Sequence, residues 1–149
     1  MRKVVYPSYS KHNYYAKQII SAYVLKKGPV PLNPFMNWGY FLDDMVNRDL
    51  VRKANTRLIE LSDEIWQFGE ISNGCYHELL LGMKRGILIK FFTVGNQLDM
   101  VKPIKNLDDL IFEQELVDEI DIEEFRQRLK EYQSSKPTSI SDQVKLLGI

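Results

Sequence analysis

Short apolar runs and longer amphipathic segments alternate along this chain of 149 residues. The apolar runs at residues 3–6, 64–68 and 87–94 are rich in β-branched and aromatic side chains, and this composition predicts three strands. The runs at 64–68 and 87–94 show little alternation, which is typical of strands that are covered on both faces of a sheet. A brief further strand is expected at 29–35, where three prolines confine it to a sheet edge.

Between these runs, apolar residues recur at helical spacing, and Gly28 is a suitable stop for the first of the helices. The predicted helices lie at 15–24, from 39–42 to Glu60, and at 75–84. Strands that alternate with helices form a parallel sheet through right-handed crossovers. The sequence therefore predicts an α/β fold with a doubly wound, flavodoxin-like parallel sheet of four to five strands flanked by helices.

The organisation changes after Lys102. A last strand is expected near 110–112, and a charged helix at 122–132 would start from Asp121, with Glu124 completing a capping box. The apolar end of the chain, VKLLGI, is suited to docking on a partner subunit. We divide the chain into an α/β core at 1–102, a strand and helix extension of the same domain at 103–133, and a flexible or partner-docking tail at 134–149.

Composition narrows the class of protein. Twenty basic and twenty acidic side chains cancel, which argues against broad binding to duplex nucleic acid, where phosphate neutralisation needs a basic surplus. The sequence contains neither an apolar run of about 18 residues for a membrane span nor the apolar stretch of a signal peptide at its start, so we expect a cytoplasmic protein. The chain has one cysteine, Cys75, so it cannot form an internal disulfide, and its two histidines offer few ligands for a metal site. We expect neither a metal ion nor a cofactor.

Candidate chemistry follows the strand at 64–68. In a doubly wound sheet the ligand crevice lies beyond the carboxyl ends of the strands, where the loops 7–13 and 69–74 leave them. The turn residues Gly74 and its neighbours lead into a helix, and Glu78 is expected in the first turn of that helix. Free amides at a helix start favour an ionised carboxylate, as a nucleophile requires. An acid at such a position is also an ordinary complement to the helix dipole, so the pattern alone leaves both interpretations open.

The stretch SDEIWQFG–EISNGCYHELLLGMKRGILI resembles the nucleoside 2-deoxyribosyltransferase-like superfamily, and most of all an uncharacterised branch of it. The shared pattern is an aspartate, an apolar strand, a loop, a glycine, three residues and a glutamate, here from Asp63 through Gly74 to Glu78. The start KVVYPSYS and the segment GPVPLNPF resemble the first and second strands of the family more loosely. The likeness covers roughly residues 3–94.

The resemblance implies that Glu78 is a catalytic nucleophile that attacks the anomeric carbon of a nucleoside or nucleotide, in an N-glycosidase or deoxyribosyltransferase reaction. Ser72 resembles the serine that the related 2′-deoxynucleoside 5′-phosphate N-hydrolases have at the matching position, where it helps to hold the phosphate. The alternative role of Ser72 is only to stabilise the turn. The first-strand tyrosine that positions the nucleophile is Tyr6 or Tyr9. The implied substrate-binding residues are Tyr6, Ser8, Tyr9, Asn13, Asn55, Ser72, Asn73 and Gly74.

One departure from the family pattern bears on catalysis. Asn55 stands where the family has the acid that assists the leaving base, and an amide cannot donate a catalytic proton. The alternative function is therefore a non-catalytic nucleotide-binding module with the same pocket. A third alternative is a structural or interaction protein in which the turn is merely inherited. Family members commonly assemble as dimers or larger, so the resemblance also implies a homodimer or higher homo-oligomer.

Overall fold

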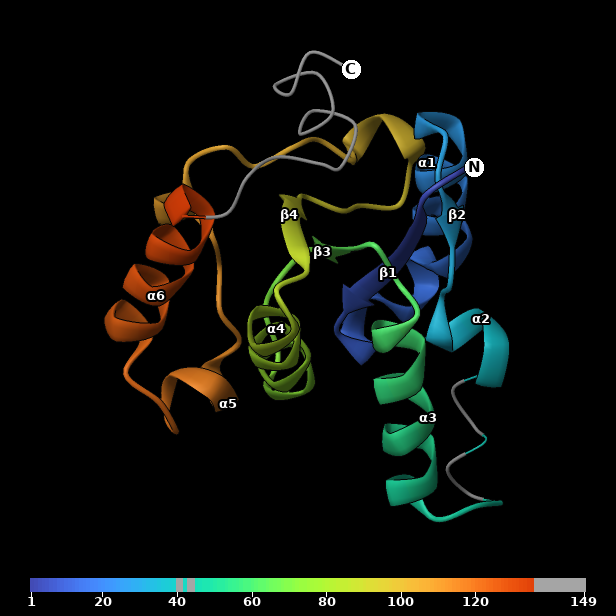
Figure 1. Ribbon diagram of the computed structural model, residues 1–149, viewed down its shortest axis with the longest axis horizontal. Coiled ribbons are helices and arrows are strands. Elements are labelled where there is room, and N and C mark those ends of the chain that lie inside the picture. Colours follow the sequence, from blue (N-terminus) through green and yellow to red (C-terminus); the bar gives the residue numbers. More distant parts are fainter. Residues whose placement is uncertain (40–41, 43–44, 136–149) are drawn as a thin grey trace.

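Four parallel strands form one sheet in the order β2-β1-β3-β4 (Figure 1). The structure is a computed structural model, and it describes residues 1–39, 42 and 45–135. The strands are β1 (Val4–Tyr9), β2 (Val30–Pro31), β3 (Glu64–Phe68) and β4 (Leu88–Phe92). Each neighbouring pair is parallel, and Tyr6 of β1 lies opposite Ile65 of β3. The predicted doubly wound parallel sheet with flanking helices is confirmed.

Helices cover both faces of this sheet. The helical elements are η1 (Lys11–Ala16), α1 (Lys17–Lys27), α2 (Pro34–Trp38), α3 (Arg48–Glu60), α4 (Asn73–Arg85), η3 (Leu98–Met100), η4 (Leu107–Asp109), α5 (Gln114–Val117) and α6 (Ile122–Ser135). Figure 1 shows α4 between α3 and α6, and these three helices pack on one face. Helix α1 and the segment around η3 pack on the other.

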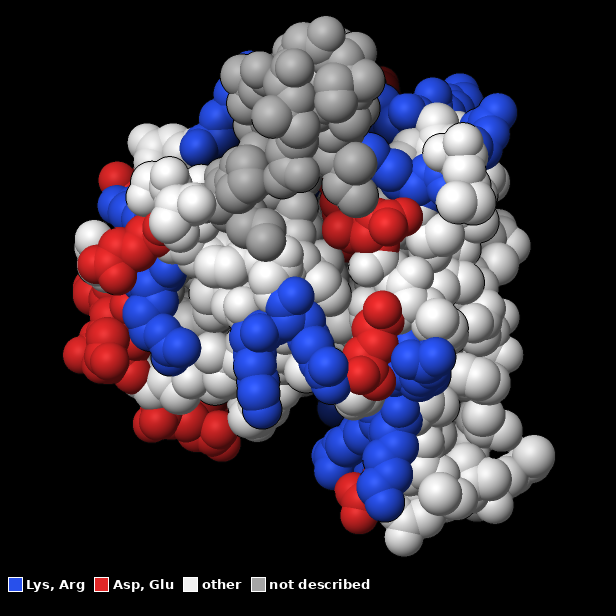
Figure 2. Space-filling view, viewed as in Figure 1, with Lys and Arg blue, Asp and Glu red and all other residues white. Residues whose placement is uncertain are grey.

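The apolar core follows the alternation of β3, whose successive side chains point to opposite faces. Ile65 belongs to the cluster shared with α3, α4 and α6, whereas Trp66 and Phe68 belong to the cluster shared with α1. All five residues of this strand are buried, as its nearly continuous apolar run predicted. Charged side chains of both signs lie on the face in Figure 2, where acidic ones gather over α5 and α6 and basic ones along α3 and α4.

Two local predictions, the start of the second helix and the last strand, differ from the structure, and the proline-rich segment adds a helix to its expected edge strand. The second helix starts at Arg48, capped by the Asn47 side chain, rather than at 39–42; residues 40 and 41 lie outside the described part. The proline-rich segment gives a two-residue edge strand and then the unpredicted short helix α2, which begins at Pro34 because proline fits the first helical position. The strand expected near 110–112 is wrong, since Phe112 makes only an isolated bridge to Ile71.

The C-terminal helix α6 packs against α4, where Phe125 meets the ring of Tyr76 at 4.7 Å between ring centres. Two α6 side chains also reach the outer edge of β4: Tyr132 donates to the carbonyl of Ile87 at 2.6 Å, and Gln133 to that of Ile89 at 3.2 Å. Of the predicted tail at 134–149, the first two residues belong to α6 and the rest lie outside the described residues. Among the described helices, none has the length and apolar character needed to cross a membrane.

Candidate functional site around Glu78

Glu78 on α4 faces β1, and both of its carboxylate oxygens accept a hydrogen bond from that strand. The Tyr6 hydroxyl donates to Oε2, and the Ser8 hydroxyl donates to Oε1 at 2.9 Å. Tyr6 and Ser8 share one face of β1 because strand side chains alternate with a period of two. The two donors therefore fix both the position and the rotation of the carboxylate.

The position of Glu78 in its helix differs from the prediction. Helix α4 begins at Asn73, two residues earlier than expected, and its first turn contains no acidic residue. Only the first four amides of a helix lack an intrahelical partner, and Glu78 lies in the second turn. The expectation that helix-start amides hold this carboxylate is wrong, because the hydroxyls of Tyr6 and Ser8 hold it instead.

The surroundings raise the pKa of both Glu78 and Tyr6. Burial raises the pKa of Glu78 to about 7, although the hydrogen bonds from Tyr6 and Ser8 act in the opposite direction. Burial, followed by the nearby charge of Glu78, raises the pKa of Tyr6 well above its ordinary value, so this phenol stays a donor at neutral pH. Glu78 is thus divided between its protonated and ionised forms near neutrality, and the helix does not keep it fully ionised.

The structure distinguishes between the two candidate tyrosines of β1. Tyr9 points to the opposite face from Tyr6, where its hydroxyl donates to Asn33 at 2.7 Å and its ring packs 5.0 Å from that of Phe35. Tyr6 is therefore the residue that contacts the carboxylate of Glu78. Tyr9 instead links β1 to the segment before α2.

Ser72 is the N-cap of α4. Its hydroxyl accepts a hydrogen bond from the amide of Cys75 at 3.2 Å and lies 3.2 Å from the Cys75 sulfur. Asn73 and Gly74 form the first turn of the helix, and Gly74 is exposed. Gly74 does not have a positive φ, so it is not the turn glycine that the sequence suggested. That role belongs to Gly69, whose φ is 74°.

The loops after β1 and β3 meet through Asn13. This side chain is buried, and its amide donates to Glu70 at 3.3 Å. A Cβ on Gly69 would lie 2.7 Å from the Asn13 amide nitrogen, so the two loops approach closely at this point. The expectation that these loops share one edge of the sheet is met, and Glu70 joins the residues found there.

Asn55 lies on α3 and is hydrogen-bonded to a residue of α2. Its carbonyl oxygen accepts a hydrogen bond from the indole nitrogen of Trp38 at 2.9 Å, which ties α3 to α2. Among the described residues, Asn55 forms no hydrogen bond with Glu78, Tyr6 or Ser8. The structure thus gives the Asn55 side chain a hydrogen-bond partner in Trp38, and the substrate-binding role that the resemblance implied for Asn55 stays a prediction.

Glu113 is a site residue that sequence reasoning missed. Backbone hydrogen bonds between Ile71 and the segment 111–113 hold it beside the end of β1. The Ser10 hydroxyl donates to one of its oxygens at 2.6 Å, and the other oxygen lies 3.9 Å from Nε2 of His12. Tyr6, Ser8 and Ser10 thus alternate along β1 and its continuation, and each donates to a carboxylate. No local signal placed Glu113 at the site, because its contact with Ser10 spans 103 positions of the chain.

Gln67 of β3 contacts Cys75 of α4 in the interior of the protein. Gln67 is fully buried, and its amide nitrogen lies 3.4 Å from the sulfur of Cys75, while its carbonyl oxygen has no hydrogen-bond partner among the described residues. Burial, and then the charge of Glu78, raises the pKa of Cys75, so this residue stays a thiol. Within the described residues, no cluster of three or more His, Cys, Asp or Glu side chains is arranged to hold a metal ion.

Glu78 is partly exposed, and among the described residues it lines neither a cavity beside Trp66 nor one beside Leu98. The chain matches no protein-family model, and no curated protein matches it significantly. The chemistry of the site therefore rests on its own geometry. A carboxylate that is oriented by two hydroxyls and has a pKa near neutrality can attack as a nucleophile when ionised, or donate a proton when protonated.

Proposed function

We propose that this protein acts on the N-glycosidic bond of a (deoxy)nucleotide or nucleoside, as an N-glycosidase or deoxyribosyltransferase, with Glu78 as the nucleophile. The observation that carries the proposal is the pair of hydrogen bonds from Tyr6 and Ser8 to the two oxygens of Glu78. A first-strand tyrosine that positions the glutamate is what the resemblance implied. Orientation of a nucleophile in this way lowers the entropy cost of attack.

The proposed reaction has two steps. A Glu78 oxygen forms a bond to the anomeric carbon while the carbon–nitrogen bond breaks. The electron pair of the carbon–nitrogen bond leaves with the base, and the base takes a proton from solvent. Water or a second base then attacks the same carbon and releases the carboxylate; attacking water gives up one proton. Hydrolysis and transfer differ only in this second acceptor.

A non-catalytic nucleotide-binding module is the second candidate. The feature that favours it is Asn55 itself, an amide that accepts a hydrogen bond from Trp38 and stands where the family that the chain resembles has the acid that assists the leaving base. In this alternative the hydroxyls of Tyr6 and Ser8 hold Glu78 as a hydrogen-bonding group for the ligand. The two candidates share a ligand class and differ in whether the base is released.

The test is incubation of the protein with a panel of deoxynucleoside monophosphates and nucleosides, with base release followed by chromatography. We expect release by the unaltered protein and loss of release in Glu78→Gln. The matched control is Glu60→Gln, because Glu60 is also partly buried but pairs with Arg85 at 2.7 Å at the end of α3. Release that persists in Glu78→Gln contradicts the nucleophile. Heat stabilisation by a nucleotide that occurs without release and is weakened in Glu78→Gln supports the binding module. If neither base release nor heat stabilisation is observed, the remaining alternative is a structural or interaction protein.

A homodimer or higher homo-oligomer stays part of the proposal, because family members that resemble this chain commonly complete each pocket with a neighbouring subunit. Sedimentation analysis of the full chain tests it directly. A monomer at micromolar concentration would contradict it.

A further inference from the structure

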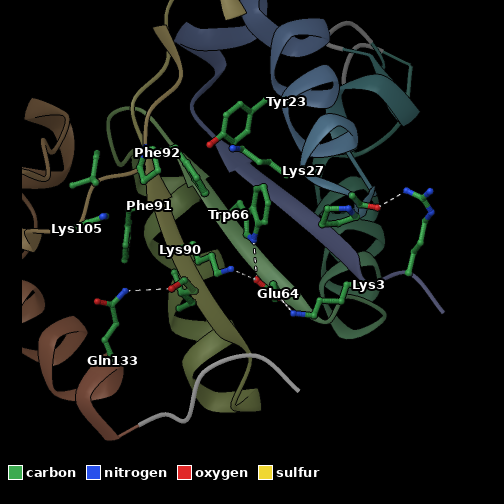
Figure 3. A pocket seen from close by; sticks show the side chains of 16 residues that line it. Lys3, Tyr23, Lys27, Glu64, Trp66, Lys90, Phe91, Phe92, Lys105 and Gln133 are labelled. Carbon is green, nitrogen blue, oxygen red and sulfur yellow. Dashed lines mark hydrogen bonds and ion pairs between the residues drawn. The ribbon is translucent and has the colours of Figure 1, made fainter. Parts of the chain in front are cut away.

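A cavity of about 760 Å³ lies at the β4 edge of the sheet, away from Glu78 (Figure 3). Trp66 and Phe92 of the sheet and Tyr23 of α1 give it an apolar wall, with ring centres 4.9 Å apart for Trp66 and Phe92 and 5.3 Å apart for Tyr23 and Phe92. The segment 103–105 and Gln133 of α6 line the opposite side. Its volume is that of a small-molecule site, which typically spans about 300 to 1,000 Å³.

The charged side chains that line this cavity are mostly positive. Among the described residues, five cationic side chains line it against a single carboxylate, Glu64. The cations are Arg2, Lys3, Lys27, Lys90 and Lys105. Because the whole chain carries no net charge, this surplus is a local feature of the cavity.

Glu64 is already neutralised. Its carboxylate lies 3.0 Å from Lys3 and 3.3 Å from Lys90, and it accepts a hydrogen bond from the Trp66 indole at 3.0 Å. Burial alone would raise its pKa, but the Trp66 hydrogen bond and the two lysines together hold the pKa below the ordinary value. Glu64 is therefore an ionised, paired group that fixes the indole and leaves the other cations of the cavity uncompensated.

Lys27 and Lys105 are two of these other cations and lie on opposite sides of the cavity, while the third, Arg2, donates a hydrogen bond to the Gly28 carbonyl at 2.8 Å. Both lysines are exposed, and within the described part of the chain no carboxylate lies within ion-pairing distance of either. The Lys27 ammonium lies 5.5 Å from the centre of the Tyr23 ring, so a positive charge sits directly beside the aromatic wall. Figure 3 shows Lys27 and Lys105 on either side of Phe92.

We propose that this cavity binds a small planar aromatic molecule that carries a phosphate-like anion, with the ring against Trp66, Tyr23 and Phe92 and the anion between Lys27 and Lys105. The small exposed parts of these three otherwise buried rings supply apolar contact for a flat ring, and the two ammonium groups supply charge complementarity for the anion. The site is separate from Glu78 and requires no chemistry there.

The test uses 1-naphthyl phosphate, which has no N-glycosidic bond, and isothermal titration calorimetry on the full chain. We expect 1-naphthyl phosphate to bind at least about tenfold more tightly than 1-naphthol, which lacks the anion, or inorganic phosphate, which lacks the ring. Binding should weaken as salt rises, because exposed charges are screened. Glu78→Gln should leave this binding unchanged, so the outcome is independent of the proposed enzymatic function.

Paired lysine variants locate the anion. We expect Lys27→Gln and Lys105→Gln each to weaken binding of 1-naphthyl phosphate by about threefold to tenfold. Lys26→Gln and Lys102→Gln are matched controls, because each is an exposed neighbour that does not line the cavity, and they should stay within about twofold. All four positions are exposed, so none of these changes should prevent folding.

The indole resonances locate the ring, since the chain has two tryptophans and only Trp66 lines the cavity. We expect the Trp66 indole peak to shift with 1-naphthyl phosphate while the Trp38 peak, assigned with Trp38→Phe, stays in place. The proposal is overturned by equal binding of 1-naphthol and 1-naphthyl phosphate, by unchanged affinity in both Lys27→Gln and Lys105→Gln, or by an unshifted Trp66 peak at millimolar ligand.

Discussion

The phenol of Tyr6 on β1 donates a hydrogen bond to the carboxylate of Glu78 on α4, across 72 positions of the chain. Each residue shifts the pKa of the other. The phenol stabilises the charged form of Glu78, and the nearby carboxylate helps to keep the phenol protonated. Ser8 completes the arrangement from the same face of the strand. This contact joins the middle of the sheet to the helix that carries the proposed nucleophile.

Removal of the Tyr6 hydroxyl should therefore impair the site more than the fold. In Tyr6→Phe we expect base release to fall by roughly tenfold to hundredfold, because Glu78 loses one of its two orienting donors. The pH at which release is half-maximal should move upward, since a hydrogen bond that lowers the pKa of Glu78 is gone. The measurement is kcat/KM as a function of pH.

Tyr9→Phe is the matched control for this change. Tyr9 lies on the same strand and its hydroxyl is also hydrogen-bonded, but its partner is Asn33 on the opposite face. We expect Tyr9→Phe to lower the free energy of unfolding by about 1 kcal/mol and to leave the pH profile in place. Equal effects of the two substitutions on base release would show that Tyr6 has no special role.

Stability should depend on pH through Glu78. Its pKa is about 7 in the folded protein against an ordinary value of 4.5, so the folded state binds this proton more tightly than the unfolded chain does. The resulting stabilisation is complete below pH 4.5 and is lost as the pH rises through about 7. The free energy of unfolding should fall across this window by at most about 1.4 kcal/mol per pH unit.

Urea unfolding between pH 5 and pH 8 measures this dependence, with Glu78→Gln as the comparison, because glutamine keeps the shape and removes the titration. The window suits the test because the pKa of Glu64 is lowered, so Glu64 contributes at more acidic pH. A Glu78→Gln protein with the same pH dependence as the unaltered chain would refute the assignment.

The fold was largely predictable from local pattern. Buried parallel strands such as β3 appear in the sequence as unbroken apolar runs, and helices such as α4 as apolar residues at helical spacing. Both patterns can be recognised from residues that are close together in the sequence. The start of α4 was misjudged because Ser72 reads equally well as a turn residue and as an N-cap. That error of two residues moved Glu78 from the second turn to the first, and with it the supposed source of its charge stabilisation.

The contacts of the site were not predictable in the same way. Ser10 and Glu113 are hydrogen-bonded across 103 positions, and no periodicity links them. The alternation that places Tyr6 and Ser8 on one face is visible only once the strand is known to extend through Pro7. The resemblance supplied Tyr6 as a candidate partner, but only the three-dimensional arrangement separates it from Tyr9.

Ser72 has two possible roles, and one pair of substitutions distinguishes them. Ser72→Ala should lower the free energy of unfolding by about 1 kcal/mol through loss of the cap on Cys75. Ser72→Asp keeps an N-cap acceptor and should stay close to the unaltered stability. If Ser72 also lies at a phosphate site, the added negative charge raises KM for nucleoside monophosphates and not for nucleosides. We expect this selective rise; an equal change for both substrates would restrict Ser72 to capping.

The two glycines that flank Ser72 should respond in opposite directions to alanine. Gly69 has a φ of 74°, and a Cβ there would lie 2.7 Å from Asn13 and 2.8 Å from Val94, so Gly69→Ala should destabilise the protein by about 1 to 3 kcal/mol. Gly74 lies in the first turn of α4 with no close neighbour, so Gly74→Ala should stabilise it by roughly 0.5 to 1 kcal/mol. Thermal unfolding of both variants measures the difference. A loss of stability in Gly74→Ala would mean that this residue, and not Gly69, holds the conformation that the turn requires.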